Sequence, residues 1–119
     1  MKKLNILITG GAGYIGSHIT EQLVNSNNII IVDNLVTGYK RLINKKAIFI
    51  EADLKNKKYL KKIIFENRID AIIHLAAYLN VSEAENNKKK YFENNVIGTL
   101  NLIKACKNSN VKNIIFSSS

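Results

Sequence analysis

Three glycines at regular spacing form the strongest chemical signal in the sequence. Gly10, Gly13 and Gly16 follow Thr9 in the segment TGGAGYIG. In such a pattern the first glycine permits a tight turn out of a strand, the second lets a pyrophosphate approach the backbone, and the third allows close packing of the helix that follows. The amides and the dipole at the start of that helix then face the anion. The pattern predicts a dinucleotide-binding turn, although glycines also mark ordinary turns.

An acidic residue follows where dinucleotide recognition requires one. Asp33 comes 17 residues after Gly16, at the end of the second apolar run. A carboxylate at this position accepts hydrogen bonds from both hydroxyls of the adenosine ribose and repels a 2′-phosphate, so it favours NAD over NADP. No arginine lies beside Asp33, and Lys40 and Arg41 follow only at a distance. The alternative is that Asp33 and Asn34 merely begin a turn.

The elements that must position these residues follow from the apolar pattern. Short runs rich in isoleucine and valine, apolar on both faces, are typical of strands in a parallel sheet that is covered on both sides. We expect such strands at 4–9, 29–33, 47–51, 71–75 and 113–117. Helical patterns lie near 14–25, 56–67 and 89–107, and residues 37–44 are expected to form a short helix or turn.

This alternation predicts the fold class. Parallel strands need crossover connections, which are right-handed almost without exception. We therefore expect a Rossmann-like, doubly wound α/β domain with five parallel strands in the order 3-2-1-4-5, incomplete at its C-terminus. The whole chain, residues 1–119, is expected to be one NAD-binding domain without its substrate domain.

Length and composition exclude several other classes of protein. The chain has 119 residues, which is the length of a single domain. Because 46% of them are hydrophobic, the chain is too apolar for a disordered tail. The only cysteine is Cys106, which excludes an internal disulfide and fits a reducing compartment. The apolar run after Lys3 is too short for a signal peptide, and no run approaches the length of a membrane span. A cytoplasmic protein without a membrane partner is expected.

The basic charge has a simple interpretation. The net charge is +9, but lysine, asparagine and isoleucine are all abundant and proline is absent, which indicates a compositional bias. In the densest lysine cluster, at 55–62, the apolar residues Leu60, Ile63 and Ile64 form a helical stripe that leaves most lysines facing water. We expect a solvated helix face and no nucleic-acid partner; a nucleic-acid patch is the alternative.

The glycine turn and Asp33 belong to a longer series of segments. These are TGGAGYIGSH at 9–18, VDNL at 32–35, EADL at 51–54, IIHLAAY at 72–78, ENNVIGTLNLI at 93–103 and NVKNIIFSSS at 110–119. In this order and spacing the chain resembles the extended short-chain dehydrogenase/reductase family. Within that family it is most similar to the UDP-glucose 4-epimerase (UDP-galactose 4-epimerase) branch, and the resemblance covers the whole chain.

The resemblance implies which residues hold the cofactor, NAD. Tyr14 and Ile15 would lie at the pyrophosphate, and Asp53 and Leu54 would flank the adenine, whose exocyclic amine would donate to the Asp53 carboxylate. The adenosine ribose would be lined by Asp33, Asn34, Leu35, Val36, Thr37 and Gly38. The cofactor would be followed toward its nicotinamide by Leu75, Ala76, Ala77, Tyr78 and Leu79. Asn94 would reach the cofactor from the fourth helix, and Ser119 matches the serine that hydrogen-bonds the reacting sugar hydroxyl.

Several of these residues have other possible uses. Asp53 is also a good helix N-cap, and Asn94 is also an ordinary polar residue of a helix surface. His18 and His74 have no partners at metal-ligand spacing, so we interpret both as structural and expect no metal. Cys106 is interpreted as a helix packing residue and not as a nucleophile.

Two positions depart from the epimerase pattern. Many epimerases have a lysine at the position of Leu79, and a small residue is common at the position of Asn80. These differences keep open a related enzyme of nucleotide sugars, a 4,6-dehydratase or a decarboxylase.

The catalytic pair of the family does not occur in this chain. The resemblance implies a tyrosine, in a Tyr-x-x-x-Lys motif, that removes the proton of the sugar 4-hydroxyl while hydride passes to NAD⁺; the 4-keto sugar then rotates and hydride returns to its other face. The residues four after the tyrosines are His18, Ile43, Ile63, Ser82 and Asn95, so none of them is lysine.

We therefore expect the N-terminal, NAD-binding part of an enzyme that interconverts UDP-glucose and UDP-galactose, inactive alone. A half-enzyme completed by a partner chain, a non-catalytic dinucleotide-binding module and the remnant of a broken gene are the alternatives. A homodimer is expected through the helix near 89–107, and the fifth strand is expected to be an exposed apolar edge.

Overall fold

The computed structural model describes residues 2–35, 39–75, 88–89 and 93–117, with the backbone alone at 93–94. Its strands are β1 (Asn5–Thr9), β2 (Asn28–Asp33), β3 (Ile48–Glu51), β4 (Ala71–His74) and β5 (Asn113–Phe116). Its helical segments are α1 (Tyr14–Leu23), the 3₁₀ turn η1 (Lys40–Leu42), α2 (Lys57–Glu66), the π-helical turn η2 (Glu93–Ile97) and α5 (Gly98–Ala105). The five strands expected from the sequence are all present, with ends that differ by one residue.

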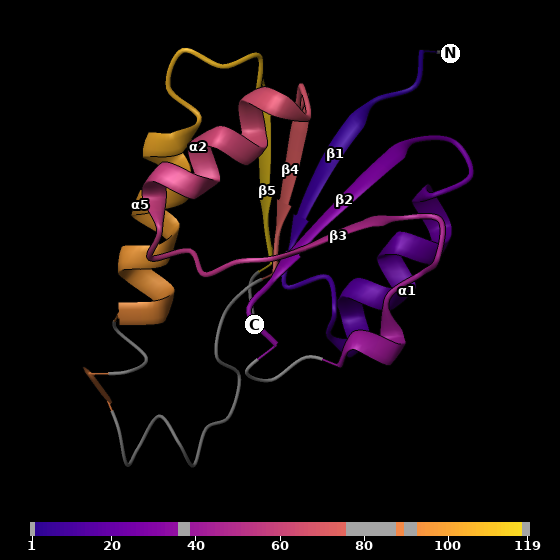
Figure 1. Cartoon of the computed structure of the whole chain (residues 1–119), viewed down its shortest axis with the longest axis horizontal. Helices are drawn as coiled ribbons and strands as arrows, with labels where there is room; N and C mark the ends of the chain where they lie inside the picture. Colours follow the sequence, from indigo (N-terminus) through magenta and orange to yellow (C-terminus); the bar gives the residue numbers. More distant parts are fainter. Residues whose placement is uncertain (1, 36–38, 76–87, 90–92, 118–119) are drawn as a thin grey trace.

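The strands form one parallel sheet in the order β3-β2-β1-β4-β5 (Figure 1). The central strand, β1, pairs on one side with β2, where Ile6 lies opposite Ile29, and on the other with β4, where Ile6 lies opposite Ala71. The predicted fold class and strand order are confirmed. Because all strands run the same way, their carboxyl ends meet at one edge of the sheet, which we call the carboxyl edge.

The core consists of two apolar clusters, one on each face of the sheet. Leu7 and Ile72 pack with residues of α2 and α5, whereas Ile6 and Ile8 pack with residues of α1. Figure 1 shows α1 on one face and α2 with α5 on the other. Neighbouring residues of a strand point to opposite faces, so each of the strands β1 to β4 supplies both clusters, whereas β5 supplies only the one that contains Leu7. This explains why the strands are continuously apolar in the sequence.

The α2 helix shows the amphipathic pattern that the sequence predicts. Leu60, Ile63 and Ile64 are its buried residues. Its N-cap is Asn56, whose side chain accepts a hydrogen bond of 3.1 Å from the amide of Tyr59. The alternative that Asp53 caps this helix is therefore wrong, since the N-cap lies three residues further on.

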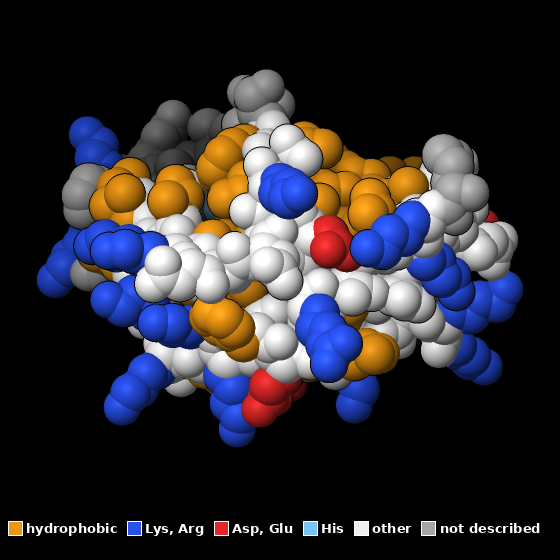
Figure 2. Space-filling model, turned by 90° about the horizontal axis from the view of Figure 1, so that it is seen from above, with side chains coloured by type: hydrophobic (Ala, Val, Ile, Leu, Met, Phe, Trp, Pro, Cys, Tyr) orange, Lys and Arg blue, Asp and Glu red, His pale blue; other side chains and the backbone are white. Residues whose placement is uncertain are grey.

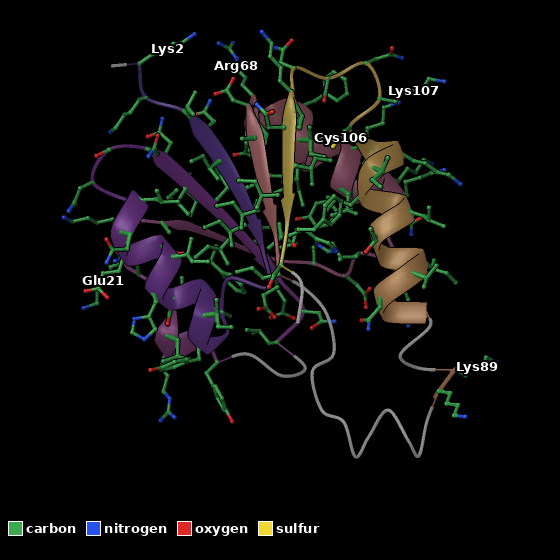
Figure 3. The ribbon with its side chains drawn as sticks, turned by 180° about the vertical axis from the view of Figure 1, so that it is seen from behind. Lys2, Glu21, Arg68, Lys89, Cys106 and Lys107 are labelled. Carbon is green, nitrogen blue, oxygen red and sulfur yellow. The ribbon has the colours of Figure 1, made fainter. Side chains whose placement is uncertain are left out.

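The segment expected as one helix at 89–107 is less regular than the sequence suggests. In the part that the structure describes, it begins with the π-helical turn η2 and continues as α5. Cys106 follows α5 and is half-buried against the α2–α5 cluster, while the neighbouring Lys107 is exposed (Figure 3). Burial raises the pKa of the Cys106 thiol, which agrees with a packing role.

The lysines of the described residues form no single patch. Those of α2 are exposed, and Lys62 pairs with Glu66 at 4.0 Å along the same helix. Figure 2 shows lysine and arginine side chains scattered over one face and along its left, lower and right margins, with few acidic side chains among them. Among the described residues, no helix has the length and apolarity needed to cross a membrane.

Candidate functional site

The chain leaves β1 through a tight turn at Gly10. This residue has φ of 75°, in the left-handed region that glycine adopts without steric cost. Its amide donates to the Val32 carbonyl at 2.8 Å, and its carbonyl accepts from the amide of Gly13 at 3.2 Å. The turn is thus fixed to the end of β2, the strand that carries Asp33.

The other glycines of the turn have different structural reasons. A Cβ on Gly16 would lie 2.6 Å from the Gly11 Cα and 2.8 Å from the Gly10 carbonyl oxygen, so only glycine fits there. A Cβ on Gly13 would meet only the Gly10 carbonyl oxygen, at an ordinary 3.5 Å. Folding alone therefore does not demand glycine at position 13, and close approach of a ligand remains the reason that the motif gives for it.

Gly11 is a packing position that the sequence reasoning missed. A Cβ there would lie 2.7 Å from the Ile31 Cγ2, so the turn lies directly on the β2 side chain. The double glycine at 10 and 11 was the available signal, but it does not reveal which strand the second glycine contacts.

The first turn of α1 is open to an anion. Gly13, its N-cap, provides no side-chain hydrogen bond, and the first turn contains no acidic residue. Within the described part of the chain, the amides of Tyr14 and Ile15 have no hydrogen-bond partner. Such amides are the usual donors to phosphate groups at a helix N-terminus. This arrangement fits a pyrophosphate.

Asp33 joins two backbone segments with its carboxylate. Its side chain is 8% exposed. Oδ2 accepts from the amide of Ala12 at 3.0 Å, and Oδ1 accepts from the amide of Leu35 at 2.7 Å. The second bond is the turn that the alternative interpretation anticipated, and it accompanies a left-handed Leu35 with φ of 63°. A carboxylate has about four acceptor positions, so capacity remains for ribose hydroxyls.

The loop between β3 and α2 is fixed at the same edge. The Ala52 amide, next to Asp53 in the sequence, donates to the Asp33 carbonyl at 3.2 Å and so joins the start of this loop to the end of β2. Asp53 is half-buried, and its Oδ1 accepts from the Lys55 amide at 2.9 Å. Leu54 is 8% exposed and belongs to the core.

A residue of α5 that the sequence reasoning missed also fixes this loop. The Asn101 side chain donates to the Leu54 carbonyl at 2.9 Å and to the Lys55 carbonyl at 3.2 Å. Asn101 and Leu54 are 47 positions apart, so no local pattern in the sequence could indicate the contact.

The end of β4 lies against the end of β1. The Leu75 amide donates to the Thr9 carbonyl at 2.9 Å and contacts the Thr9 hydroxyl at 3.2 Å. His74, just before it, is 6% exposed and hydrogen-bonded through its ring, which agrees with the structural interpretation. His18 is exposed and its ring contacts that of Tyr14.

The structure thus brings the glycine turn, Asp33, Asn34, Leu35, Asp53, Leu54 and Leu75 to the carboxyl edge. Several other expected site residues lie outside the described residues: Val36, Thr37, Gly38, Ala76, Ala77, Tyr78, Leu79 and Ser119. The same holds for the side chain of Asn94.

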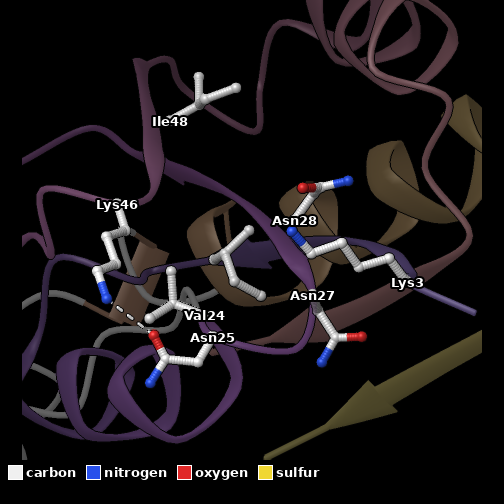
Figure 4. A pocket seen from close by; sticks show the side chains of 8 residues that line it. Lys3, Val24, Asn25, Asn27, Asn28, Lys46 and Ile48 are labelled. Carbon is white, nitrogen blue, oxygen red and sulfur yellow. Dashed lines mark hydrogen bonds between the residues drawn. The ribbon is translucent and has the colours of Figure 1, made fainter. Parts of the chain in front are cut away.

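A pocket at the opposite, amino edge of the sheet is separate from this site (Figure 4). Lys3 and Lys46 line it together with three asparagines and the apolar side chains of Val24, Ile29 and Ile48. The Lys46 Nζ donates to the Asn25 Oδ1 at 2.9 Å. None of the expected site residues lines this pocket.

Comparisons with known proteins agree with this geometry. Residues 6–119 match the family described as the NAD dependent epimerase/dehydratase family. A UDP-glucose 4-epimerase of Lactobacillus helveticus is 40% identical over 117 residues, which cover 98% of this chain and 36% of that protein.

Two solved structures are similar over nearly the whole chain. The UDP-glucose 4-epimerase of Thermotoga maritima, solved with UDP-glucose, matches with a TM-score of 0.94 and 36% identity, covering 98% of this chain and 38% of that one. The enzyme of Brucella ovis, solved in complex with NAD, matches with a TM-score of 0.91 and 36% identity, covering 97% of this chain and 35% of that one. The chain corresponds to the N-terminal part of such enzymes.

Proposed function

Because the chain belongs to the NAD dependent epimerase/dehydratase family, we propose that its carboxyl edge binds NAD, as the cofactor-binding part of a UDP-glucose 4-epimerase. The observation that carries this proposal is the pair formed by an uncapped helix N-terminus and the Asp33 carboxylate, which are joined through the amide of Ala12. One suits a pyrophosphate and the other suits a ribose.

Each described residue has a defined part in this proposal. The amides of Tyr14 and Ile15 bind the pyrophosphate, and Gly13 leaves room for it. Asp33 orients the adenosine ribose and disfavours a 2′-phosphate. Asp53 accepts from the adenine amine. Hydride acceptance and return, on which interconversion of UDP-glucose and UDP-galactose through a 4-keto sugar depends, is the chemistry that bound NAD supplies.

Cofactor binding is tested by calorimetric titration of the chain with NAD⁺ and with NADP⁺. We expect saturable binding of NAD⁺ and an affinity for NADP⁺ lower by about tenfold or more, or roughly 1.4 kcal/mol. Gly13→Ala should weaken NAD⁺ binding because its methyl group occupies the space of the pyrophosphate. Lys46→Ala, at the amino edge, is the matched control and should bind NAD⁺ normally. Equal binding of both nucleotides, or of neither, contradicts the proposal.

Epimerisation is a proposal for the larger enzyme of which this chain would be the N-terminal part. The chain contains no Tyr-x-x-x-Lys motif, so we expect no interconversion of UDP-glucose and UDP-galactose when it is incubated alone with NAD⁺. Measurable formation of UDP-galactose by the pure chain would show that another base replaces the missing tyrosine.

A homodimer through the helical segment of η2 and α5 is part of the proposal. Val96, Leu100 and Ile103 are 41%, 48% and 46% exposed and form one apolar stripe at helical spacing. Leu100→Glu should shift the chain toward monomer in sedimentation velocity. Leu4→Glu makes the same change at a side chain 40% exposed near the amino edge and should leave the association unchanged.

The basic charge does not alter this proposal. We propose a cytoplasmic protein whose exposed lysines are solvated and bind no nucleic acid. In a titration with duplex DNA at low salt we expect no saturable binding. Binding that weakens steeply as salt rises would overturn this expectation, because release of counterions is the mark of phosphate contacts.

A further inference from the structure

His74 is the last residue of β4, and its ring lies where three strands end. It is paired in register with Thr9 of β1 on one side and with Phe116 of β5 on the other. The ring is 6% exposed and meets the Phe116 ring edge-on, with centroids 5.7 Å apart. A buried polar ring needs hydrogen-bond partners, and this one has a partner at each nitrogen.

The two partners come from different elements. Nδ1 lies 2.5 Å from the hydroxyl of Thr9 in β1, and Nε2 lies 3.0 Å from the hydroxyl of Thr99 in α5. The Thr99 hydroxyl donates its proton to the carbonyl of Asn95 in η2 at 2.6 Å. It can therefore only accept from His74, which places a proton on Nε2.

The donor and acceptor at Nδ1 can be assigned in the same way. The Thr9 hydroxyl contacts the Leu75 amide at 3.2 Å, and that contact uses the oxygen as an acceptor. Its own proton is then available for Nδ1, which has none in this tautomer. Every donor and acceptor is satisfied when the ring is neutral and protonated at Nε2. Burial lowers the pKa of His74 and so favours the neutral ring.

The position of this network indicates what it orients. In a doubly wound sheet a dinucleotide lies across the point where the strand order reverses, which here is between β1 and β4. With the adenosine over β2 and Asp33, and the pyrophosphate at the turn after β1, the second half of the dinucleotide must lie over the end of β4. The network connects this end with η2 and β1.

We propose that His74 is a positioning residue that holds η2 and Leu75 in place for the nicotinamide half of the cofactor. This inference rests on the proposed NAD binding. It assigns no contact between His74 and the cofactor; the ring acts through Thr9 and Thr99.

The first test needs no substitution. ¹⁵N NMR of the imidazole in this chain, near neutral pH, distinguishes the two neutral tautomers and the charged ring. We expect the Nε2–H tautomer. A ring protonated at Nδ1 alone, or a charged ring, would overturn the network.

The second test separates positioning from stability. Thr99→Val removes the hydroxyl while it keeps the shape, and Thr99→Ser restores the hydroxyl. The chain is titrated with NAD⁺ and with ADP-ribose, which lacks the nicotinamide ring. We expect Thr99→Val to weaken NAD⁺ binding several-fold and to leave ADP-ribose binding unchanged, with Thr99→Ser close to the original chain. His74→Asn, which retains an acceptor toward Thr9 but loses the donor toward Thr99, should resemble Thr99→Val.

The outcomes are distinguishable from failure of the proposed function. If the unsubstituted chain binds neither ligand, the proposed NAD site is wrong. If the unsubstituted chain binds both and Thr99→Val weakens both equally or neither, NAD binding stands and the positioning role of His74 is wrong.

Discussion

The glycine turn is the clearest case in which single residues determine the site. Gly16→Ala places a methyl group within 2.8 Å of the Gly10 carbonyl oxygen, and backbone cannot move aside as a flexible side chain can. We expect this substitution to lower the free energy of unfolding by about 1–3 kcal/mol, the usual cost of overpacking. Urea denaturation measures the change.

Gly13→Ala is the matched comparison for stability. Gly13 has φ of −83°, which any residue adopts, and its added methyl group has ordinary contacts. Since alanine is a poorer N-cap than glycine, a loss of about 1 kcal/mol or less is expected. A larger loss for Gly13→Ala than for Gly16→Ala would contradict the assignment of one glycine to ligand approach and the other to packing.

His74 gives the stability of the chain a dependence on pH. Burial lowers the pKa of its imidazole below the ordinary 6.5, so the unfolded chain binds the proton more readily than the folded one. The stabilising contribution is complete above about pH 6.5 and is lost as pH falls from there toward the lower pKa of the folded state. The urea midpoint should therefore be lower at acidic pH, and His74→Gln should flatten this part of the profile. An unchanged profile in that variant would exclude His74 as the cause.

The glycine turn and Asp33 could be predicted from the sequence because a short stretch of the chain contains the whole pattern that identifies them. The sequence did not predict the partners of His74, because Thr99 is 25 residues away and reaches the ring only after α5 has packed on the sheet. Asn56, which the sequence reasoning missed as a cap, is as good a cap by residue type as Asp53. The choice between them depended on where α2 begins, which is set by packing of Leu60 and its neighbours in the core.

At the scale of single elements, the N-cap of α2 contributes to the stability of the chain. Asn56→Ala removes the acceptor for the Tyr59 amide and should lower the free energy of unfolding by about 1 kcal/mol. Lys58→Ala, at an exposed position of the same first turn, is the control and should change it by no more than about 0.5 kcal/mol. Equal effects of the two substitutions, measured by urea denaturation, would mean that the cap contributes nothing.

The order of the elements could be predicted from the sequence, but the shape of one of them could not. Alternating apolar runs and helical stripes determined the sheet, since both are periodic signals. The π-helical turn at Glu93–Ile97 has no such signal. It lies beside the close contact of Gly98 with Leu54, where an added Cβ would be 3.2 Å from the Leu54 Cβ, and this contact belongs to tertiary packing.

At the scale of the whole molecule, β5 forms an apolar margin. Within the described residues, β5 pairs with β4 alone, and Ile115 and Phe116 are 60% and 49% exposed. An apolar edge of this kind favours association with other chains. Ile115→Lys should reduce light scattering at high concentration, with a stability change within about 0.5 kcal/mol because the side chain is mostly exposed. Unaltered scattering in this variant would mean that the chains associate through another surface. The apolar stripe on η2 and α5 would then be the next site to substitute.

The central position of β1 also affects the order in which the sheet can form during synthesis. Of the five strands, β1 is the first to be synthesised. Its partner β2 begins at Asn28, and its other partner, β4, begins only at Ala71. The sheet consequently cannot grow outward from one margin as the nascent chain emerges. The side of β1 that pairs with β4 stays open until Ala71–His74 have been made. Parallel pairings between distant segments form slowly, because the chain must close long loops before the contacts compensate. The nascent chain therefore leaves one side of its central strand unpaired until β4 has been made, and this is the stage at which chaperones would protect it most.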